Sequence, residues 1–408
     1  MDRNLSPAKA AWRLMSVALL CAAWTPAVRA DPEEGLTFSA SQTVAHDSNL
    51  FRLPGAADPL LVLGRPDRSE RWSITSARLR YLKDFSLQRV DIDIGLADYR
   101  YQEASNLDLL AKNYTLEWAW AVTPALRGRL RSERATTVGD LADATNPNAP
   151  SERLRRVDLF DAVYQIDGVW SLLGSSQQKR DQSEQVLRGE ESTVLRFGEI
   201  GLRYRPRSGN SITARWREGN GDVLRNSSGS GFLRDDQFTQ REQWLDVQWN
   251  PTAKLANTLS LGRIDRGYER IAVRDFAGTN TLLNLRWQTT AKTQWGLRWA
   301  SEIGGFQTDQ SSSVTTQTLG LNFGWQIAPR TSLLIDTSAA RRRYGGTLPG
   351  QPANELRDTT RDSSIGLRWS ISPQFQLETQ LASTRRKSTQ PSQSFSSLRS
   401  SISLSAGF

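Results

Sequence analysis

Apolar and polar residues alternate along most of the chain from Leu36 onward, in segments of roughly 12 to 16 residues. In the clearest segment, 319–327, the large apolar residues share one parity, while Gly, Asn and Gln hold the other. Alternate side chains of a β-strand point to opposite faces. The positions of the other parity often carry Arg, Asp or Gln. The core between the two packed sheets of a β-sandwich would not accommodate these side chains. The apolar face is therefore expected to point outward.

This alternation predicts an all-β protein, a transmembrane antiparallel β-barrel of the outer-membrane type, in which only every second residue faces lipid. We expect about eighteen strands; sixteen is the alternative because parity shifts within 68–82 and 151–182. The even number places both chain ends on the same side. The predicted strands begin near residues 35, 68, 86, 107, 126, 151, 168, 192, 209, 237, 255, 276, 293, 313, 330, 357, 374 and 394.

The connections between these strands are alternately short and long. Several short ones follow an aromatic residue and contain proline, as after Trp249, Trp325 and Trp369. Tryptophan prefers a membrane–water interface, so these residues predict an aromatic girdle. The long connections are polar or rich in Gly, Pro, Ser and Asn, and we expect them at the opposite end of the barrel: residues 49–67, 139–150, 181–191, 221–236 and 345–354.

The two ends of the chain fit an exported barrel. Residues 1–30 combine basic residues, an apolar run and small residues before Ala30, which predicts a signal peptide that is cleaved on export to a Gram-negative outer membrane. The only cysteine, Cys21, lies within it. Residues 31–408 are then one barrel domain. Segment 401–408 alternates and ends on Phe408, so it is expected to close the barrel against the strand near Gly35 and to present Phe408 to the outer-membrane insertion machinery.

Composition argues against a helical membrane protein and against a nucleic-acid-binding protein. Mean hydropathy is −0.52 and no later segment approaches the roughly 18 consecutive apolar residues of a membrane helix. The formal net charge of +9 is small for 408 residues and is not clustered, so nucleic-acid binding is not expected.

Candidate catalytic chemistry is sparse. His46 is the only histidine, and its neighbour Asp47 points to the other face of a strand, so the two cannot converge on one site. We therefore expect no enzyme, no metal site and no cofactor.

Arginine outnumbers lysine strongly, since lysine occupies only seven of 52 basic positions. Many arginines share the inward parity, together with acidic residues such as Asp91, Asp93, Glu117 and Asp246. They line a passage for anionic or polyhydroxylated molecules, or they brace a wide barrel through carboxylate pairs. Both interpretations stay open. The candidate contact residues in the lumen are Arg127, Arg129, Arg203, Arg205, Arg215, Arg217, Arg286, Arg298 and Arg368.

The phrase at 46–54, His-Asp-Ser-Asn-Leu-Phe-Arg-Leu-Pro, resembles the N-terminal signature of EpsL-type outer-membrane proteins of exosortase/PEP-CTERM exopolysaccharide loci, a group within the β-barrel porins. Segments 98–102 and 204–209 resemble two further blocks of that family. The resemblance implies a role in exopolysaccharide biosynthesis or export, with the polymer as substrate and periplasmic export components as partners. It carries no catalytic residues. The loop candidates in the phrase are Asp47, Asn49, Phe51 and Arg52, and Pro54 and Pro59 fit a constrained loop that folds into the barrel mouth.

The function expected from these observations is a conduit for an exopolysaccharide through the outer membrane. The alternatives are a general or specific porin for small solutes, and a non-conducting barrel that serves as a scaffold for export partners.

Overall fold

A computed structural model describes residues 34–139, 141–143, 146, 152–184, 192–224, 237–306, 311–347 and 356–408. These residues form one closed sheet of 18 antiparallel strands. The all-β outer-membrane-type barrel is confirmed, and the sixteen-stranded alternative is wrong. The predicted signal peptide, 1–30, lies outside the described residues.

The first half of the barrel has nine strands, each of 13 to 16 residues. They are β1 (Gly35–Asp47), β2 (Glu70–Phe85), β3 (Gln88–Tyr101), β4 (Leu109–Ala121), β5 (Leu126–Val138), β6 (Glu152–Gln165), β7 (Trp170–Ser183), β8 (Ser192–Tyr204) and β9 (Ser211–Leu224).

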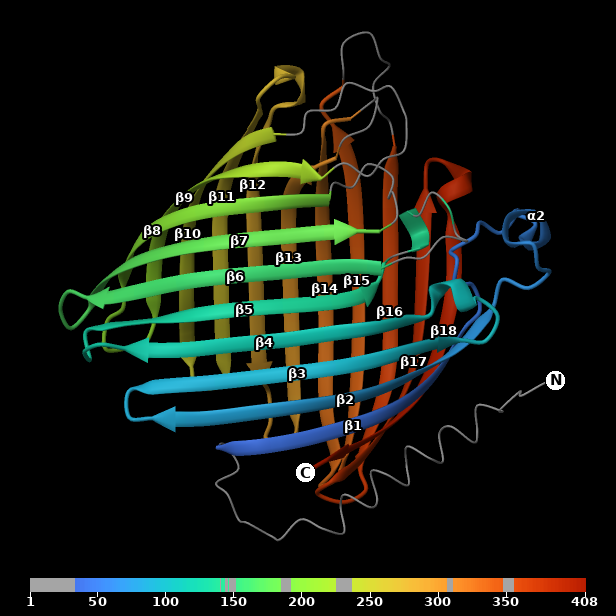
Figure 1. Ribbon diagram of the computed structural model, residues 1–408, viewed down its shortest axis with the longest axis horizontal. Helices are drawn as coiled ribbons and strands as arrows, with labels where there is room; N and C mark the ends of the chain where they lie inside the picture. Colours follow the sequence, from blue (N-terminus) through green and yellow to red (C-terminus); the bar gives the residue numbers. More distant parts are fainter. Residues whose placement is uncertain are drawn as a thin grey trace.

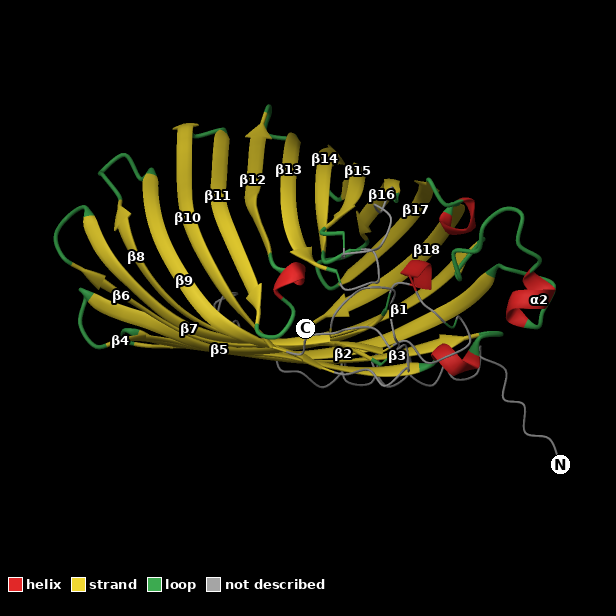
Figure 2. Ribbon diagram, turned by 90° about the horizontal axis from the view of Figure 1, so that it is seen from above, coloured by secondary structure: helices red, strands yellow, loops and turns green. Residues whose placement is uncertain are grey.

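The second half continues in the same order. It comprises β10 (Gln237–Thr252), β11 (Leu255–Tyr268), β12 (Phe276–Gln288), β13 (Thr293–Gly305), β14 (Ser313–Ala328), β15 (Thr331–Gly345), β16 (Arg357–Ser370), β17 (Phe375–Ser388) and β18 (Phe395–Gly407). Figure 2 shows the walls formed by β1–β9 and β10–β18 facing one another. Every predicted strand start lies within two residues of an observed one. One detail differs: Pro251 belongs to β10, which continues through a register shift between Trp249 and Thr252.

The barrel closes between its first and last strands, as predicted. β1 and β18 pair from Ser39 opposite Gly407 to Asp47 opposite Arg399. Phe38 and Phe408 exchange two backbone hydrogen bonds, each with N···O of 2.8 Å. Closure leaves no free sheet edge, so the strands satisfy one another's backbone groups in a bilayer that offers no water.

The two ends of the barrel differ. Short turns and both ends of the described chain lie at one end, which we call the turn end; the long connections lie at the other, the loop end (Figure 1). The loop end also carries the helix α2 (Pro59–Leu63) and the 3-10 turns η1 (Ser105–Leu107), η2 (Leu141–Asp143), η3 (Ala272–Arg274) and η4 (Pro391–Gln393). Among the described residues, no helix is long and apolar enough to cross a membrane.

The outward parity carries the large apolar side chains. Leu319 and Leu321 on β14 are 47% and 44% exposed, although they are far from any chain end. An aromatic girdle forms at the turn end, as predicted. Exposed side chains there belong to Tyr204, Trp249, Trp287, Trp325 and Trp369. Such an apolar band with an aromatic rim matches the lipid-facing surface of a membrane barrel.

Candidate functional site

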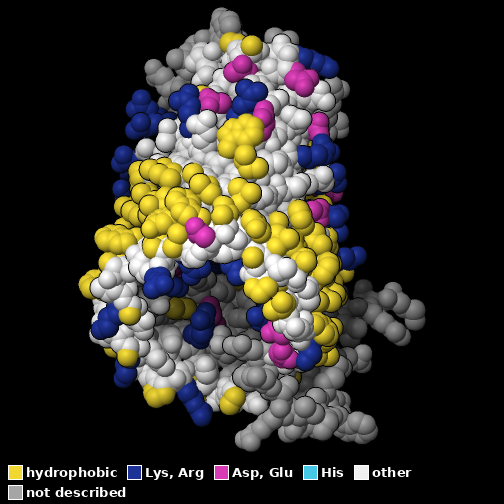
Figure 3. All heavy atoms as spheres, turned by 90° about the vertical axis from the view of Figure 1, so that its left-hand side faces the viewer, with side chains coloured by type: hydrophobic (Ala, Val, Ile, Leu, Met, Phe, Trp, Pro, Cys, Tyr) yellow, Lys and Arg dark blue, Asp and Glu magenta, His cyan; other side chains and the backbone are white. Residues whose placement is uncertain are grey.

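The inner face of the barrel is polar and charged, because it takes the parity opposite to the apolar band. A cavity of about 900 Å³ lies along the inner wall of β3–β11. Five predicted lumen arginines line it: Arg127, Arg129, Arg203, Arg215 and Arg217. Figure 3 looks onto the turn ends of β2–β9 and shows a hollow with Lys and Arg side chains inside it.

Most arginines in the middle of this wall are paired with carboxylates, and we call them the braced arginines. Glu199 accepts from both Arg215 (2.9 Å) and Arg217 (2.8 Å). Arg215 also donates to Asp246 at 2.6 Å. The remaining pairs of this kind are Arg129–Asp161 (2.7 Å), Arg131–Glu117 (3.2 Å), Arg131–Glu133 (2.7 Å), Arg80–Asp91 (2.7 Å) and Arg78–Asp93.

Backbone spacing helps to fix one of these side chains. Arg215 on β9 lies across Gly201 of the neighbouring β8, where an added Cβ would come within 3.0 Å of the Arg215 Cγ. A larger residue at 201 would push this guanidinium away from Glu199 and Asp246. Part of the charged wall is therefore held in a fixed arrangement, which accords with the bracing interpretation.

A second group of arginines lies at the turn end and has different surroundings. Arg127, Arg203, Arg205 and Arg207 line one cavity of about 280 Å³, together with Gln165 and Ser171. We call these four residues the turn-end cluster. No carboxylate lines this cavity, and none of the four guanidinium groups pairs with an acidic side chain among the residues that the structure describes. The Arg203 Nε donates only to Thr213 Oγ1, at 3.3 Å.

The acidic groups nearest this cluster have other partners. Asp167, in the turn that follows β6, accepts from the backbone N–H groups of Val169 (2.8 Å) and Trp170 (2.7 Å). These hydrogen bonds lower the pKa of the Asp167 carboxyl. Asp246 is held by Arg215 and by the Ser260 hydroxyl (2.6 Å). The turn-end cluster thus keeps positive charge that the wall does not neutralise directly.

The other three predicted lumen arginines do not join either group. Arg286 and Arg298 have the inward parity on β12 and β13, opposite to the exposed Trp287 and Trp299, but line neither cavity. Arg368 on β16 pairs with Glu378 on β17 at 2.9 Å. Sequence parity therefore places the eight arginines that lie on strands on the inner face, whereas Arg205 lies in the turn after β8, and parity does not tell which of the nine converge.

The wall formed by β14–β18 and β1 is different again. Many of its inward positions carry hydroxyl-bearing side chains, interspersed with charged residues such as Asp362 and Arg399, and we call it the hydroxyl wall. The Thr43 hydroxyl donates to Ser403 at 2.9 Å across the β1–β18 seam. A cavity of about 520 Å³ lies against this wall, and its hydroxyl-bearing lining residues are Thr316, Thr318, Thr360, Thr384 and Ser397.

The predicted loop residues Asp47, Asn49 and Arg52 form one anchored network at the loop end. The Arg52 guanidinium binds the Asp47 carboxylate (2.9 Å), which is 1% exposed and also accepts from the Ser397 hydroxyl of β18. The Asn49 amide donates to the carbonyls of Leu53 (2.8 Å) and Ser396 (3.0 Å). Arg52 adopts the left-handed backbone conformation, with φ of 58°. The network ties the start of the β1–β2 loop to the barrel seam.

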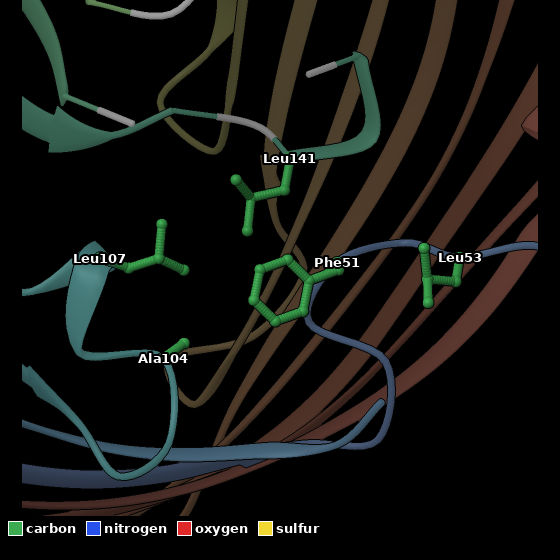
Figure 4. Packing of buried hydrophobic residues seen from close by; sticks show 5 residues of the cluster. All are labelled: Phe51, Leu53, Ala104, Leu107 and Leu141. Carbon is green, nitrogen blue, oxygen red and sulfur yellow. The ribbon is translucent and has the colours of Figure 1, made fainter. Parts of the chain in front are cut away.

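This anchoring directs Phe51 and Leu53 into an apolar cluster at the mouth. Phe51 is 5% exposed, and Figure 4 shows the side chains of Leu141, Leu107 and Ala104 gathered on one side of its ring. The cluster joins three separate connections, those after β1, β3 and β5. Its buried members are Phe51, Leu53, Ala104, Leu107 and Leu141.

Two connections reach the lumen. Arg52 and Ala142 line the cavity against the hydroxyl wall, with Thr316 and Thr318 of β14. β5 and β14 are nine strands apart in a ring of eighteen, so Ala142 of η2 reaches in from the wall opposite β14. The rest of the β1–β2 loop stays outside: Leu61 on α2 is 85% exposed, and Figure 1 shows α2 at the periphery. Only the first part of that loop folds into the mouth as predicted.

Two buried ion pairs at the loop end escaped sequence reasoning. Asp358 and Arg386 are 1% and 4% exposed and lie 2.6 Å apart, and Tyr344 donates to Asp358 at 2.8 Å. Glu70 accepts from Arg65 (2.8 Å) and from the backbone of Glu103 and Ala104 (both 3.0 Å). The inward parity of β16 and β17 was a signal for Asp358 and Arg386, but parity alone does not indicate their burial.

His46 and Asp47 lie on opposite faces of β1, since His46 shares the parity of the exposed Val44 and Asp47 is buried inward. No group of three or more His, Cys, Asp or Glu residues capable of holding a metal ion occurs in the described part of the chain.

Comparison with known proteins supports a porin-type barrel. A family model described as "Putative beta-barrel porin 2" matches residues 247–408. OccK9 (OpdG) of Pseudomonas aeruginosa superposes with a TM-score of 0.50 at 10% identity, covering 91% of this chain and 98% of that chain. OpdK of Pseudomonas aeruginosa, crystallised with vanillate, gives 0.49 at 9% identity and covers 91% and 99%. OccAB4 of Acinetobacter baumannii gives 0.48 at 9% identity and covers 92% and 99%.

At this level of identity the likeness to OccK9 concerns the fold alone. A comparison with curated protein sequences gives no match.

Proposed function

We propose that this protein is an outer-membrane channel for the passive diffusion of small hydrophilic solutes, with a preference for anions. The observation that carries the proposal is the cavity of about 900 Å³ along the inner wall, lined by six arginines, among them the five predicted ones. Guanidinium groups in a passage attract anions and offer paired donors to carboxylate or phosphate oxygens. The partial match to a porin family model and the 18-stranded fold support the same class of function.

Selectivity arises from the uneven distribution of charge. The braced arginines contribute little net potential, because Asp or Glu lies within hydrogen-bonding distance of each. The turn-end cluster supplies the excess positive charge. Conduction requires contacts that are strong enough to admit a solute and weak enough to release it. Ala142 of η2, which lines the cavity against the opposite wall, would narrow the passage there and favour small solutes over polymers.

Solute flux in proteoliposomes tests this proposal. We expect liposomes that contain the protein to swell faster in succinate than in ethylenediammonium, a small dication of similar size, and to swell in neither when the protein is absent. Equal swelling rates for the two ions would contradict the proposed anion preference. Absence of swelling with any small solute would contradict the proposed channel function.

A second candidate function is export of an exopolysaccharide, in keeping with the resemblance at 46–54. The hydroxyl wall favours it, because hydroxyl side chains interspersed with Arg342 and Asp362 suit polyhydroxylated molecules. The signature phrase would then anchor the mouth through Asp47 and Arg52. Block of the channel by polysaccharide fragments, without block by small sugars, supports export. A deletion strain that secretes normal polysaccharide, with none in the periplasm, contradicts it.

The barrel would lie in a Gram-negative outer membrane with its turn end in the periplasm, where export partners would meet it. The non-conducting scaffold makes a different prediction: reconstituted protein shows no conductance, and charge reversal at Arg203 or Arg298 leaves secretion unchanged.

A further inference from the structure

We infer that the turn-end cluster is an oxyanion-binding site at one mouth of the lumen. The site would take a carboxylate or phosphate group of a solute that enters or leaves the channel. The inference deepens the proposed function and rests on it, because a bound solute must be released for transport. It concerns four residues that three separate segments bring together: Arg127 of β5, Arg203 of β8, and Arg205 and Arg207 of the turn after β8.

The strand register explains how these side chains converge. Arg127 pairs with Val163 of β6, Gln165 of β6 with Ser171 of β7, and Ser171 with Arg203 of β8. Arg127 and Arg203 therefore stand near one level of the barrel with two strands between them. The intervening inward positions are the short or neutral Val163, Gln165 and Ser171. Long guanidinium side chains can reach over them into one space, the cavity of about 280 Å³.

The lining of that cavity selects for an anion with oxygen acceptors. Guanidinium groups supply forked N–H donors, and Gln165 and Ser171 supply an amide and a hydroxyl. A carboxylate or phosphate accepts several such bonds at once, whereas a chloride ion lacks the matching geometry. Cations are repelled, since no carboxylate lines the cavity.

The contrast with the braced arginines argues against a merely structural role. Arg215 and Arg217 have Glu199 as a fixed partner at 2.9 and 2.8 Å, and a solute would have to displace it. Arg127, Arg205 and Arg207 have no such partner among the described residues, and Arg203 has only a neutral hydroxyl at 3.3 Å. Like charges that converge without a counterion repel one another at this solvated mouth, and a bound oxyanion relieves that repulsion. A purely structural role does not explain why these four arginines converge on one cavity without carboxylate partners.

Titration calorimetry on the detergent-solubilised full chain tests the site directly, with inorganic pyrophosphate as the probe and sodium chloride at constant ionic strength. We expect the double variant R127Q/R203Q to lose affinity by about tenfold or more, as expected for lost charge-assisted hydrogen bonds. The matched control R286Q/R298Q removes the same charge from inward positions outside the cavity, and should change affinity by less than about twofold.

Equal losses of pyrophosphate affinity in both double variants would indicate a diffuse positive potential in the lumen and would contradict a site at the turn-end cluster. Wild-type protein that does not bind pyrophosphate would contradict the site as well. Citrate in place of pyrophosphate distinguishes a carboxylate site from a phosphate site. In planar bilayers, pyrophosphate added at the turn end should block more strongly than the same concentration at the loop end.

Calorimetry does not depend on conduction, so the two proposals fail separately. Pyrophosphate binding without any conductance would contradict the channel function and support the binding site. Conductance without pyrophosphate binding would contradict the binding site and support the channel function.

Discussion

The braced arginines and the turn-end cluster carry the same side chain in opposite surroundings. In the middle of the wall, each guanidinium meets a carboxylate, and Arg215 and Arg217 share Glu199. At the turn end, four guanidinium groups share a cavity that no carboxylate lines. Bracing and solute contact, which sequence alone left as competing interpretations, thus apply to different positions on one wall. Substitutions of the braced pairs are therefore expected to change mainly the stability of the barrel. Substitutions in the turn-end cluster are expected to change mainly its ion selectivity.

The largest effect is expected at the buried Asp358–Arg386 pair of the loop end, which is an arginine–carboxylate pair like those of the braced arginines. Asp358→Ala takes the Asp358 carboxylate from the Arg386 guanidinium, which is 4% exposed. Because breaking a buried ion pair is strongly unfavourable, the free energy of unfolding should fall by about 3–5 kcal/mol. Denaturant unfolding of the folded barrel in micelles measures it. Arg203→Ala is the control from the turn-end cluster and should stay within about 0.5 kcal/mol; equal losses would erase the distinction between the groups.

Removing a shared brace should have an intermediate effect. Glu199→Gln takes the carboxylate from Arg215 and Arg217, and Glu199 is only 12% exposed. We expect a loss of about 1–3 kcal/mol, the usual range for hydrogen bonds to charged groups. The same variant should become more selective for anions, because it removes a negative charge from the wall while Arg215 and Arg217 stay positively charged. Glu378→Gln, whose pair with Arg368 is more exposed, should cost about 0–1 kcal/mol.

Neutralising the turn-end cluster should leave stability unchanged and alter permeation. Arg203→Gln removes a charge that no carboxylate balances. The ratio of chloride to potassium permeability should fall about two- to threefold, since the local potential acts at the mouth of the passage. Arg298→Gln, which lies outside both cavities, should give a smaller change. A stability loss as large as that of Glu199→Gln would mean that Arg203 is itself a structural residue.

The smallest effect is expected at His46, which belongs to neither group. His46→Ala should shift stability by less than about 0.5 kcal/mol and leave conductance unchanged, because the side chain faces away from the lumen. Loss of conductance in this variant would reopen the question of a functional role for the only histidine.

The sequence predicts the barrel well because the constraint is local. Lipid outside and water inside force each strand to alternate, so parity alone located all eighteen strands and placed Arg203 and Arg215 on the inner face. Parity shifts at 68–82 reflect Trp72, which turns inward near the loop end and stacks on Tyr101 at 5.8 Å. Above the membrane, the rule that apolar residues face outward no longer applies.

What the sequence did not reveal depends on register and on loops. Whether an arginine meets a carboxylate is set by its cross-strand neighbours, as with Glu199 beside Arg217. The burial of Phe51 requires Leu107 and Leu141 from two other connections. The phrase at 46–54 carries a family resemblance without a mechanism, and the structure gives it a physical role in anchoring the mouth through Asp47, Asn49 and Arg52. No periodicity in the chain encodes such contacts.

The reversal potential of single channels in a potassium chloride gradient tests the central claim most directly. We expect the wild-type barrel to conduct and to prefer chloride, and the triple variant R127Q/R203Q/R205Q to lose most of that preference at unchanged stability. A wild-type channel that prefers potassium, or a triple variant with undiminished anion preference, would contradict the assignment of selectivity to the turn-end cluster.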